Sequence, residues 1–224
     1  GLARSTEAFE AEQYQGFLSS GYQLIKESKF VEARSAFEQA SALQPDSVQV
    51  AQALEELGLR ERMAKIKALK YKALSAEVNE RWASAQELYA NILELDPNIS
   101  EIQENLIRVD QRIKLENNLI YFTNITDKLN DDKLYNQAVQ VLSTADSIVN
   151  KGPSLEKQIV DLRQILSIAA TPVPVTIFSD EMTEVVIYKI GNLGVFKQNI
   201  VSLRPGVYIA TGSRTGYRDF QIRF

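Results

Sequence analysis

Apolar residues recur at helical spacing through roughly the first three quarters of the chain. Two segments, residues 30–45 and 82–97, repeat the same order of aromatic residue, alanine, aromatic residue and closing proline. A weaker third copy follows further along the chain. The alanines that the copies share, Ala33, Ala85 and Ala138, are 52 and 53 residues apart. Self-similarity at a fixed period indicates a repeated helical unit.

Each copy has the pattern of a helical hairpin. Small residues at Ala33 and Ala40 allow two helices to approach closely, and Phe37 lies between them on the same face. Pro45 then ends the second helix. We therefore expect alanines at close helix contacts and aromatic residues in the inter-helical core. The expected contact residues are Ala33, Ala40 and Ala85, and the expected core residues are Phe37, Trp82 and Tyr89.

Three further segments, residues 47–67, 99–115 and 154–168, keep apolar residues at helical spacing. They account for the length of each repeat beyond a simple hairpin. We expect them to extend the hairpins as long antiparallel helices.

A domain boundary is predicted at Thr171-Pro172-Val173-Pro174, because two prolines forbid the continuation of a helix. Beyond it, short apolar runs alternate with polar residues and are separated by turn residues. This pattern indicates four to five antiparallel strands. The predicted fold class is α+β in two domains: an all-α array of helical hairpins over residues 1–170, and a small antiparallel β-sandwich over residues 171–224.

The first copy resembles the tetratricopeptide repeat family, whose unit carries small and aromatic residues at fixed positions and a terminal proline. The matching residues are Phe17, Gly21, Ala33, Phe37, Ala40 and Pro45. The second copy departs from the family at Leu69, Ala73 and Ile92, and the third lacks the closing proline. The resemblance implies that the inner face of each first helix lines a groove for a protein or peptide.

Transfer of the family's groove positions selects two sets of four residues. They are Gln15, Leu18, Tyr22 and Ile25 from the first copy, and Lys67, Lys70, Leu74 and Glu77 from the second. The alternative is that several of the apolar members pack against neighbouring helices. Leu18 and Tyr22 stand where repeats that bind chaperone tails carry lysine and asparagine, so chaperone recognition is in doubt.

The turn from Leu203 to Tyr208 contains Pro205-Gly206, and Gly216-Tyr217 follows it. This arrangement resembles the PEGA family of small, surface-associated β-sandwiches. Helical repeats combined with such a tail are similar to the extracytoplasmic parts of bacterial envelope proteins. The resemblance implies a periplasmic or extracytoplasmic location. Since the sequence begins with Gly1 rather than Met, we expect it to be a fragment or a processed product. The resemblance implies that a segment upstream of it supplies an inner-membrane anchor.

Composition narrows the function classes. The chain has a formal net charge of −4 and no basic run, which argues against a nucleic-acid partner. It contains no cysteine and no histidine, which excludes thiolate nucleophiles, Cys/His zinc sites and a histidine general base. No apolar stretch approaches the length of a membrane span.

Candidate chemistry is sparse. Two acidic pairs, Asp131-Asp132 and Asp180-Glu181, could bind a cation or act as acid and base, but aspartate at such places more often begins a helix or a turn. We expect no catalytic residue, metal or cofactor. A possible surface for a ligand on the β domain comprises Arg204, Arg214, Tyr217 and Arg218, which could equally be turn charges and packing aromatics.

The sequence therefore predicts a non-enzymatic scaffold that binds a protein or peptide through the helical array. One alternative is an envelope protein that binds cell-wall carbohydrate through the β domain. Another is the regulatory subunit of an enzyme.

Overall fold

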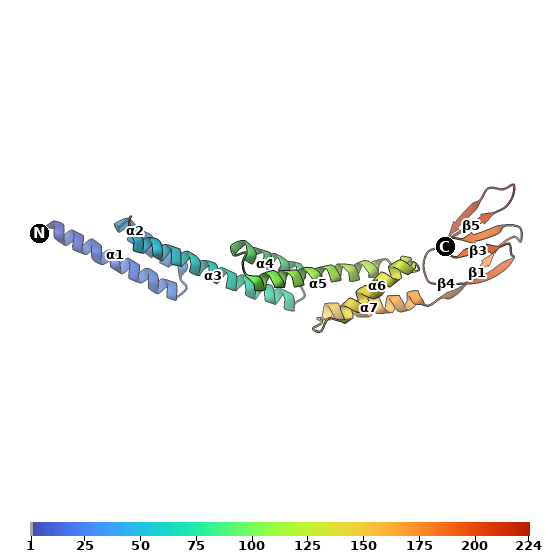
Figure 1. Cartoon of the computed structure of the whole chain (residues 1–224), viewed down its shortest axis with the longest axis horizontal. Helices are drawn as coiled ribbons and strands as arrows, with labels where there is room; N and C mark the ends of the chain where they lie inside the picture. The colour runs from blue at the N-terminus through green and yellow to red at the C-terminus, as the bar shows by residue number, and fades with distance from the viewer. Residues whose placement is uncertain (1) are drawn as a thin grey trace. The chain divides into compact units, whose positions relative to one another are not determined.

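The computed structural model describes residues 2–224, with side chains from Glu7 onward. Seven α-helices precede six β-strands (Figure 1), which confirms the predicted α+β class. The helices are α1 (Leu2–Lys26), α2 (Phe30–Leu43), α3 (Val48–Val78), α4 (Trp82–Leu95), α5 (Ser100–Asn124), α6 (Asp132–Asp146) and α7 (Pro153–Ala170), with a short 3-10 helix at Thr126–Lys128.

The first hairpin, α1 with α2, packs as its pattern of small residues predicts. Ala33, Phe37 and Ala40 of α2 are fully buried in one apolar cluster with Tyr14, Leu18 and Ile25 of α1. The chain reverses at Ser28, whose φ of 59° is the left-handed conformation that ends many helices. The amide of Lys29 donates to the carbonyl of Leu24 at 2.9 Å and closes this turn.

The first half of α3 completes this core, with Val50, Ala53 and Leu57 in the same cluster. On the surface, Arg34 of α2 forms an ion pair with Glu61 of α3 at 2.7 Å. The first structural unit is therefore three-helical rather than a two-helix hairpin.

The same arrangement recurs at the predicted period. Glu80 has a φ of 52° at the position equivalent to Ser28, 52 residues later. Ala85, Tyr89 and Ile92 of α4 are fully buried, as are Ala138 and Ala145 of α6. The residues equivalent to Val50 and Leu57 are also buried, and they are Ile102, Val109, Leu155 and Leu162.

Residues 47–67 were expected to extend the hairpins as a long antiparallel helix, and they form part of a still longer one. Helix α3 runs without a break from Val48 to Val78. One helix therefore closes the first unit with its N-terminal half and opens the second with its C-terminal half. Between Leu57 and Ala73, α3 has no buried residue.

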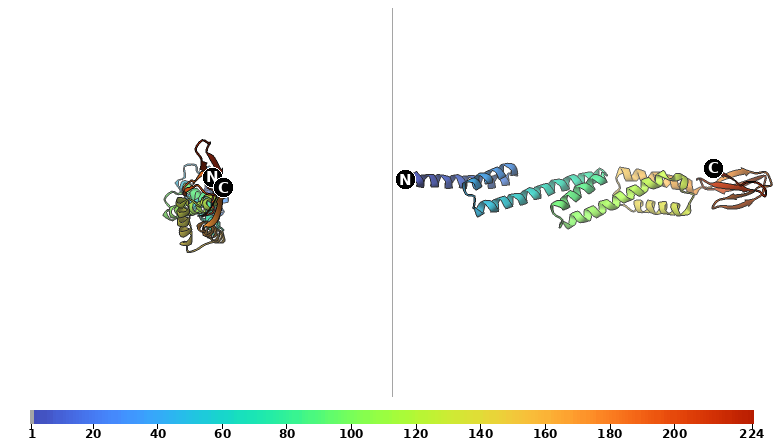
Figure 2. Two further views of the ribbon diagram at one scale, coloured as in Figure 1. Left: turned by 90° about the vertical axis from the view of Figure 1, so that its right-hand side faces the viewer. Right: turned by 90° about the horizontal axis from the view of Figure 1, so that it is seen from above.

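The third unit is formed by α6, α7 and the C-terminal half of α5, which lie side by side (Figure 2). Its own apolar core includes Leu119, Leu129, Ala138, Leu155 and Leu162. Glu80 caps α7, because its carboxylate accepts from the amides of Ser154 at 2.7 Å and Leu155 at 3.0 Å.

Trp82 was expected in the core, but it is only half-buried, under the guanidinium of Arg112 at 5.0 Å from the ring centre. Burial lowers the pKa of Arg112, and the carboxylate of Glu80, 3.5 Å away, acts against that shift.

The strands form two sheets, with six strands in place of the four to five expected. In one, β1 (Val173–Phe178) pairs with β4 (Gln198–Leu203). The other has the order β3-β2-β5-β6, and its strands are β2 (Glu184–Ile187), β3 (Gly191–Gly194), β5 (Ile209–Ser213) and β6 (Phe220–Arg223). All pairs are antiparallel, and Val185, Ile187 and Ala210 form the small buried core.

The contacts between residues divide the chain into two compact units, and their boundary does not lie where the helices end and the strands begin. One compact unit holds residues 1–77 and 83–107, and the other holds 78–82 and 108–224. The change from helix to strand lies between Ala170 and Val173. The strands thus belong to the same compact unit as α6 and α7.

Two helical glycines give a matched test of this packing. A Cβ at Gly21 would lie 2.3 Å from Cε1 of the buried Phe37 ring, whereas a Cβ at Gly58 would have no neighbour within 4 Å. Gly21→Ala is expected to destabilise the protein by about 1–3 kcal/mol through overpacking. Gly58→Ala is expected to stabilise it by about 0.5–1 kcal/mol, because alanine loses less backbone entropy in a helix. Urea unfolding of both variants measures the difference, and equal effects of the two would contradict the close approach of α1 to α2.

Candidate functional site

Four of the eight predicted groove residues have structural roles. Leu18 and Ile25 are only 6% and 8% exposed and belong to the core of the first unit, so they do not line an open groove. Lys70 donates to the carboxylate of Glu101 at 2.7 Å. Glu77 accepts a hydrogen bond from the hydroxyl of Tyr89 at 2.6 Å.

The other four, Gln15, Tyr22, Lys67 and Leu74, are exposed. Tyr22 and Leu74 occupy equivalent positions of successive repeats, as do Gln15 and Lys67. Tyr22 packs against Phe37 with ring centres 5.3 Å apart, and it is 38% exposed.

A larger exposed surface lies on α3, along the stretch that has no buried residue. Leu59, Met63, Tyr71 and Leu74 are 53%, 57%, 77% and 44% exposed. At 100° per residue, these four and Lys67 fall within about a third of the helix circumference. We call these five residues the α3 face.

Of the α3 face, only Lys67 and Leu74 were predicted from the sequence. The missing members could have been found from the spacing of Leu59, Met63 and Tyr71, which continues the row of Lys67 at intervals of four residues.

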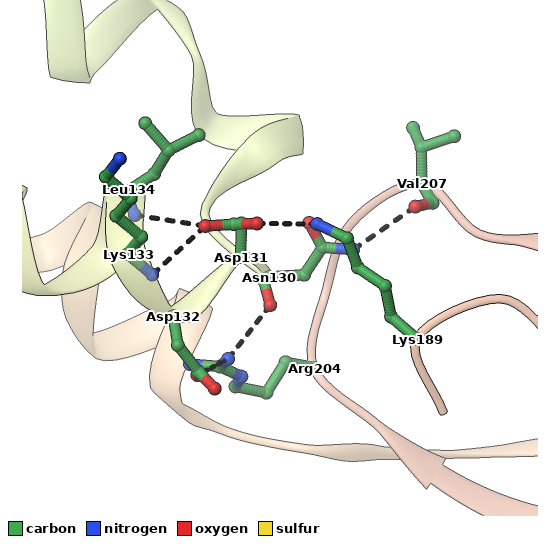
Figure 3. A network of polar contacts seen from close by, with 8 residues as sticks. All are labelled: Asn130, Asp131, Asp132, Lys133, Leu134, Lys189, Arg204 and Val207. Atoms are coloured by element: carbon green, nitrogen blue, oxygen red, sulfur yellow. Dashed lines mark hydrogen bonds and ion pairs between the residues drawn. The ribbon is translucent and has the colours of Figure 1, made fainter. Parts of the chain in front are cut away.

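On the β domain, Arg204 does not belong to a free surface. Its guanidinium donates to the carbonyl of Asn130 at 2.9 Å and to the carboxylate of Asp132 (Figure 3). It also stacks over Tyr135 at 5.6 Å. Arg204 therefore joins the β domain to the start of α6.

Asp131 holds the same junction and also caps α6. One carboxylate oxygen accepts from the amides of Lys133 at 3.0 Å and Leu134 at 3.2 Å, which confirms a helix-start role. The other accepts from Nζ of Lys189 at 2.6 Å. The hydrogen bond from Lys189, followed by that from Leu134, lowers the pKa of Asp131, and the same contact raises the pKa of Lys189.

Backbone groups complete the junction. The side-chain amide of Asn130 donates to the carbonyl of Val207 at 3.2 Å, and the amide of Val207 donates to the carbonyl of Asp127 at 3.3 Å. Gly206 allows this approach, because a Cβ there would lie 2.5 Å from Cγ of Asn130. A cavity of about 720 Å³ opens beside these contacts, and its lining includes Lys133, Pro172, Tyr188, Lys189, Tyr208 and Arg223.

The remaining predicted β-domain residues lie in a separate turn. Arg214 stacks over Tyr217 at 4.6 Å and approaches the carboxylate of Asp180 at 3.3 Å. Tyr217 and Arg218 are exposed. Asp180 accepts from the amides of Met182 and Thr183, and the bond from Met182 is the largest cause that lowers the pKa of Asp180 to about 2. Asp180 thus fixes a turn, as expected for an aspartate there.

Searches against family models, curated proteins and solved structures found no match to the chain. Among residues 2–224, no helix is both long and apolar enough to cross a membrane. The same described part contains no cluster of acidic residues with the grouping that a metal site requires.

The junction can be tested at Lys189, which has a φ of 65°. Lys189→Asn should preserve this turn, because asparagine tolerates the left-handed conformation, while it removes the ammonium group. Amide exchange of Val207, which is bonded to Asp127, should then accelerate about two- to fivefold, as expected for loss of an exposed ion pair. Lys157→Asn, at an ion pair within α7, is the control and should leave Val207 unchanged.

The pH dependence of the junction follows from Asp131. Because its pKa is lowered in the folded protein, its contribution is present above the ordinary aspartate value of 3.8 and is lost as pH falls through the lowered value. Asp131→Asn keeps a side chain that can cap α6 but cannot titrate. The loss of folding stability at acid pH, measured by urea unfolding at a series of pH values, should therefore be smaller in this variant than in the parent. Equal acid dependence of the parent and Asp131→Asn would contradict the assigned role.

Proposed function

We propose that the chain is a non-enzymatic interaction scaffold whose helical units bind a protein or peptide. The α3 face is the observation that carries this proposal. Large apolar side chains along a helix are normally turned towards a core, whereas here four of them are 44% to 77% exposed. Burial of such side chains against a partner is worth about 1.5–3 kcal/mol each when complete.

The chemistry of the α3 face suits an amphipathic helix. Its residues follow intervals of three and four, the spacing at which a second helix can interdigitate its own side chains. Lys67 lies in the middle of the row, so the best partner has an acidic residue between apolar ones.

The β domain supplies the second part of the proposal. Its resemblance to PEGA modules and the resemblance of the helices to tetratricopeptide repeats favour a location in the bacterial cell envelope. In that setting the helical array captures the partner and the β domain docks to a second surface.

A capture experiment tests the scaffold. The intact chain is used as bait in bacterial envelope extract, beside the variant Met63→Ser/Tyr71→Ser. Both residues are more than half exposed, so the variant should fold with a change of no more than about 0.5 kcal/mol per site. The control is Val31→Ser, at a site on α2 that is 80% exposed and outside the α3 face.

Proteins that depend on the α3 face should be lost from the double variant, with binding at least about tenfold weaker, and retained by the control. An identical set of captured proteins for all three baits would contradict the proposal.

The cavity at the junction favours a second candidate function, the binding of carbohydrate by the β domain. Its volume of about 720 Å³ is in the range of small-ligand sites, and Tyr188 at its edge is 67% exposed. Titration with peptidoglycan and polysaccharide fragments, monitored by calorimetry, should give binding that is weakened by Tyr188→Ala. Absence of heat from every fragment would exclude this function for the fragments tested.

A further inference from the structure

Strand β6 leaves one side of its sheet open. It is the last strand in the order β3-β2-β5-β6 and pairs only with β5. Within residues 2–224, no strand pairs with its other side. An open edge of this kind is a template for another strand.

The hydrogen-bond pattern shows which residues face the open edge. Tyr208 and Phe224 exchange both backbone hydrogen bonds, at 2.9 and 3.1 Å. In an antiparallel ladder, such pairs alternate with pairs whose backbone groups point away. Ile222 and Phe220 therefore direct their backbone groups to β5, and Gln221 and Arg223 direct theirs to the open edge.

The side chains of β6 leave an apolar row uncovered. Phe220 and Ile222 lie opposite Gly212 and Ala210, and so share the face of the sheet that carries the buried core. Yet Phe220, Ile222 and Phe224 are 68%, 51% and 39% exposed, while Ala210 on the adjacent strand is 6% exposed. The apolar face of the sheet is therefore exposed at β6, the strand whose edge is also open.

We propose that β6 pairs with β6 of a second copy of this chain. The two strands run antiparallel about a two-fold axis at Gln221 and join two four-stranded sheets into one. Such a contact is isologous, since each copy offers the same surface. At the centre of the ladder, Gln221 pairs with Gln221 of the second copy.

The charges beside and within β6 favour a second copy of the same strand as the partner, and they favour one alignment of the two strands. With the axis at Gln221, Asp219 lies opposite Arg223 of the second copy, and the symmetry forms this pair twice. Phe220 lies opposite Ile222 of the second copy, so that two apolar pairs form on the core face. An axis moved by one residue, to Ile222, would place Arg223 opposite Gln221, so that Asp219 and Arg223 would no longer lie opposite each other.

The edge-facing positions agree with this register. Gln221 and Arg223 of β6 alternate with Asp219, which directly precedes the strand. The backbone groups of Gln221 and Arg223 point away from β5, so the ladder can form its hydrogen bonds without disturbing the pairing of β5 with β6. A contact made by so short a strand buries less than a standard interface of about 800 Å² per partner. The dimer is therefore weak and dependent on concentration.

Charge reversal tests the proposal with the intact chain. Asp219→Lys places two positive charges opposite each other at each end of the ladder, and Arg223→Asp places two negative charges there. Each variant alone should dimerise at least about tenfold more weakly than the parent in sedimentation equilibrium. An equimolar mixture of the two should recover the dimer, because each position then faces the opposite charge.

A backbone variant gives an independent measurement. In Gln221→Pro the lost amide hydrogen is one that faces the open edge, so the bonds to β5 remain and proline is tolerated there. This variant should be monomeric, with the far-ultraviolet circular dichroism of the parent. A parent that stays monomeric over about a hundredfold range of concentration, reaching the high micromolar range of weak interfaces, would overturn the proposal. Failure of the mixed charge variants to recover a parental dimer would also overturn it.

Discussion

Close approach of paired helices is the constraint on which the rest of the helical structure depends. At Gly21 and Ala33 the first hairpin has no room for a larger side chain, and the ring of Phe37 fills the space that remains. The equivalent alanines Ala85 and Ala138 are fully buried in the same way. The small residues thereby fix how the two helices of each pair lie against each other. A third helix then packs on the pair through buried residues such as Leu57 and Leu162.

Helix α3 takes part in two such arrangements, one at each of its ends. Its two ends are held in two different cores, so its middle lies between them and contributes no buried residue. A helix that carries Leu59, Met63 and Tyr71 there has apolar surface that the described chain does not cover. Repeat proteins offer extended surfaces because neighbouring units contact only each other. The α3 face is a surface of this kind, placed on a shared helix.

The β domain depends on a different kind of interaction. Its own core is small, since its main apolar cluster contains only three buried residues, Val185, Ile187 and Ala210, and its contacts with the start of α6 are mainly polar. Asp131 performs two tasks there, since it caps α6 and accepts from Lys189. A domain that buries so little apolar area has only marginal folding stability by itself. The junction with α6 and the proposed pairing of β6 both add to that stability.

The sequence by itself determined the features that are set by local chemistry. The period of 52 to 53 residues, the small and aromatic positions of the hairpins, the end of the last helix before Pro172 and the helix-start role of Asp131 all depend on residues close together in the chain. Tertiary structure alone decided which periodic residues are covered. Leu18 and Tyr22 lie on one helix at helical spacing, yet only Leu18 is buried, because helices distant in sequence close over it.

Long-range contacts also explain why Arg204 and Arg218 differ. Arg204 is bonded to residues more than seventy positions away in the sequence, whereas Arg218 is exposed. The division of α3 between two cores was also a tertiary outcome. Nothing local breaks the chain near Lys67, and the halves of α3 are distinguished only by the cores they enter. The exposed side of β6 is the clearest instance. Its alternation predicts a strand, whereas its place at the end of the order β3-β2-β5-β6, which leaves its edge open, is decided by how the strands pair.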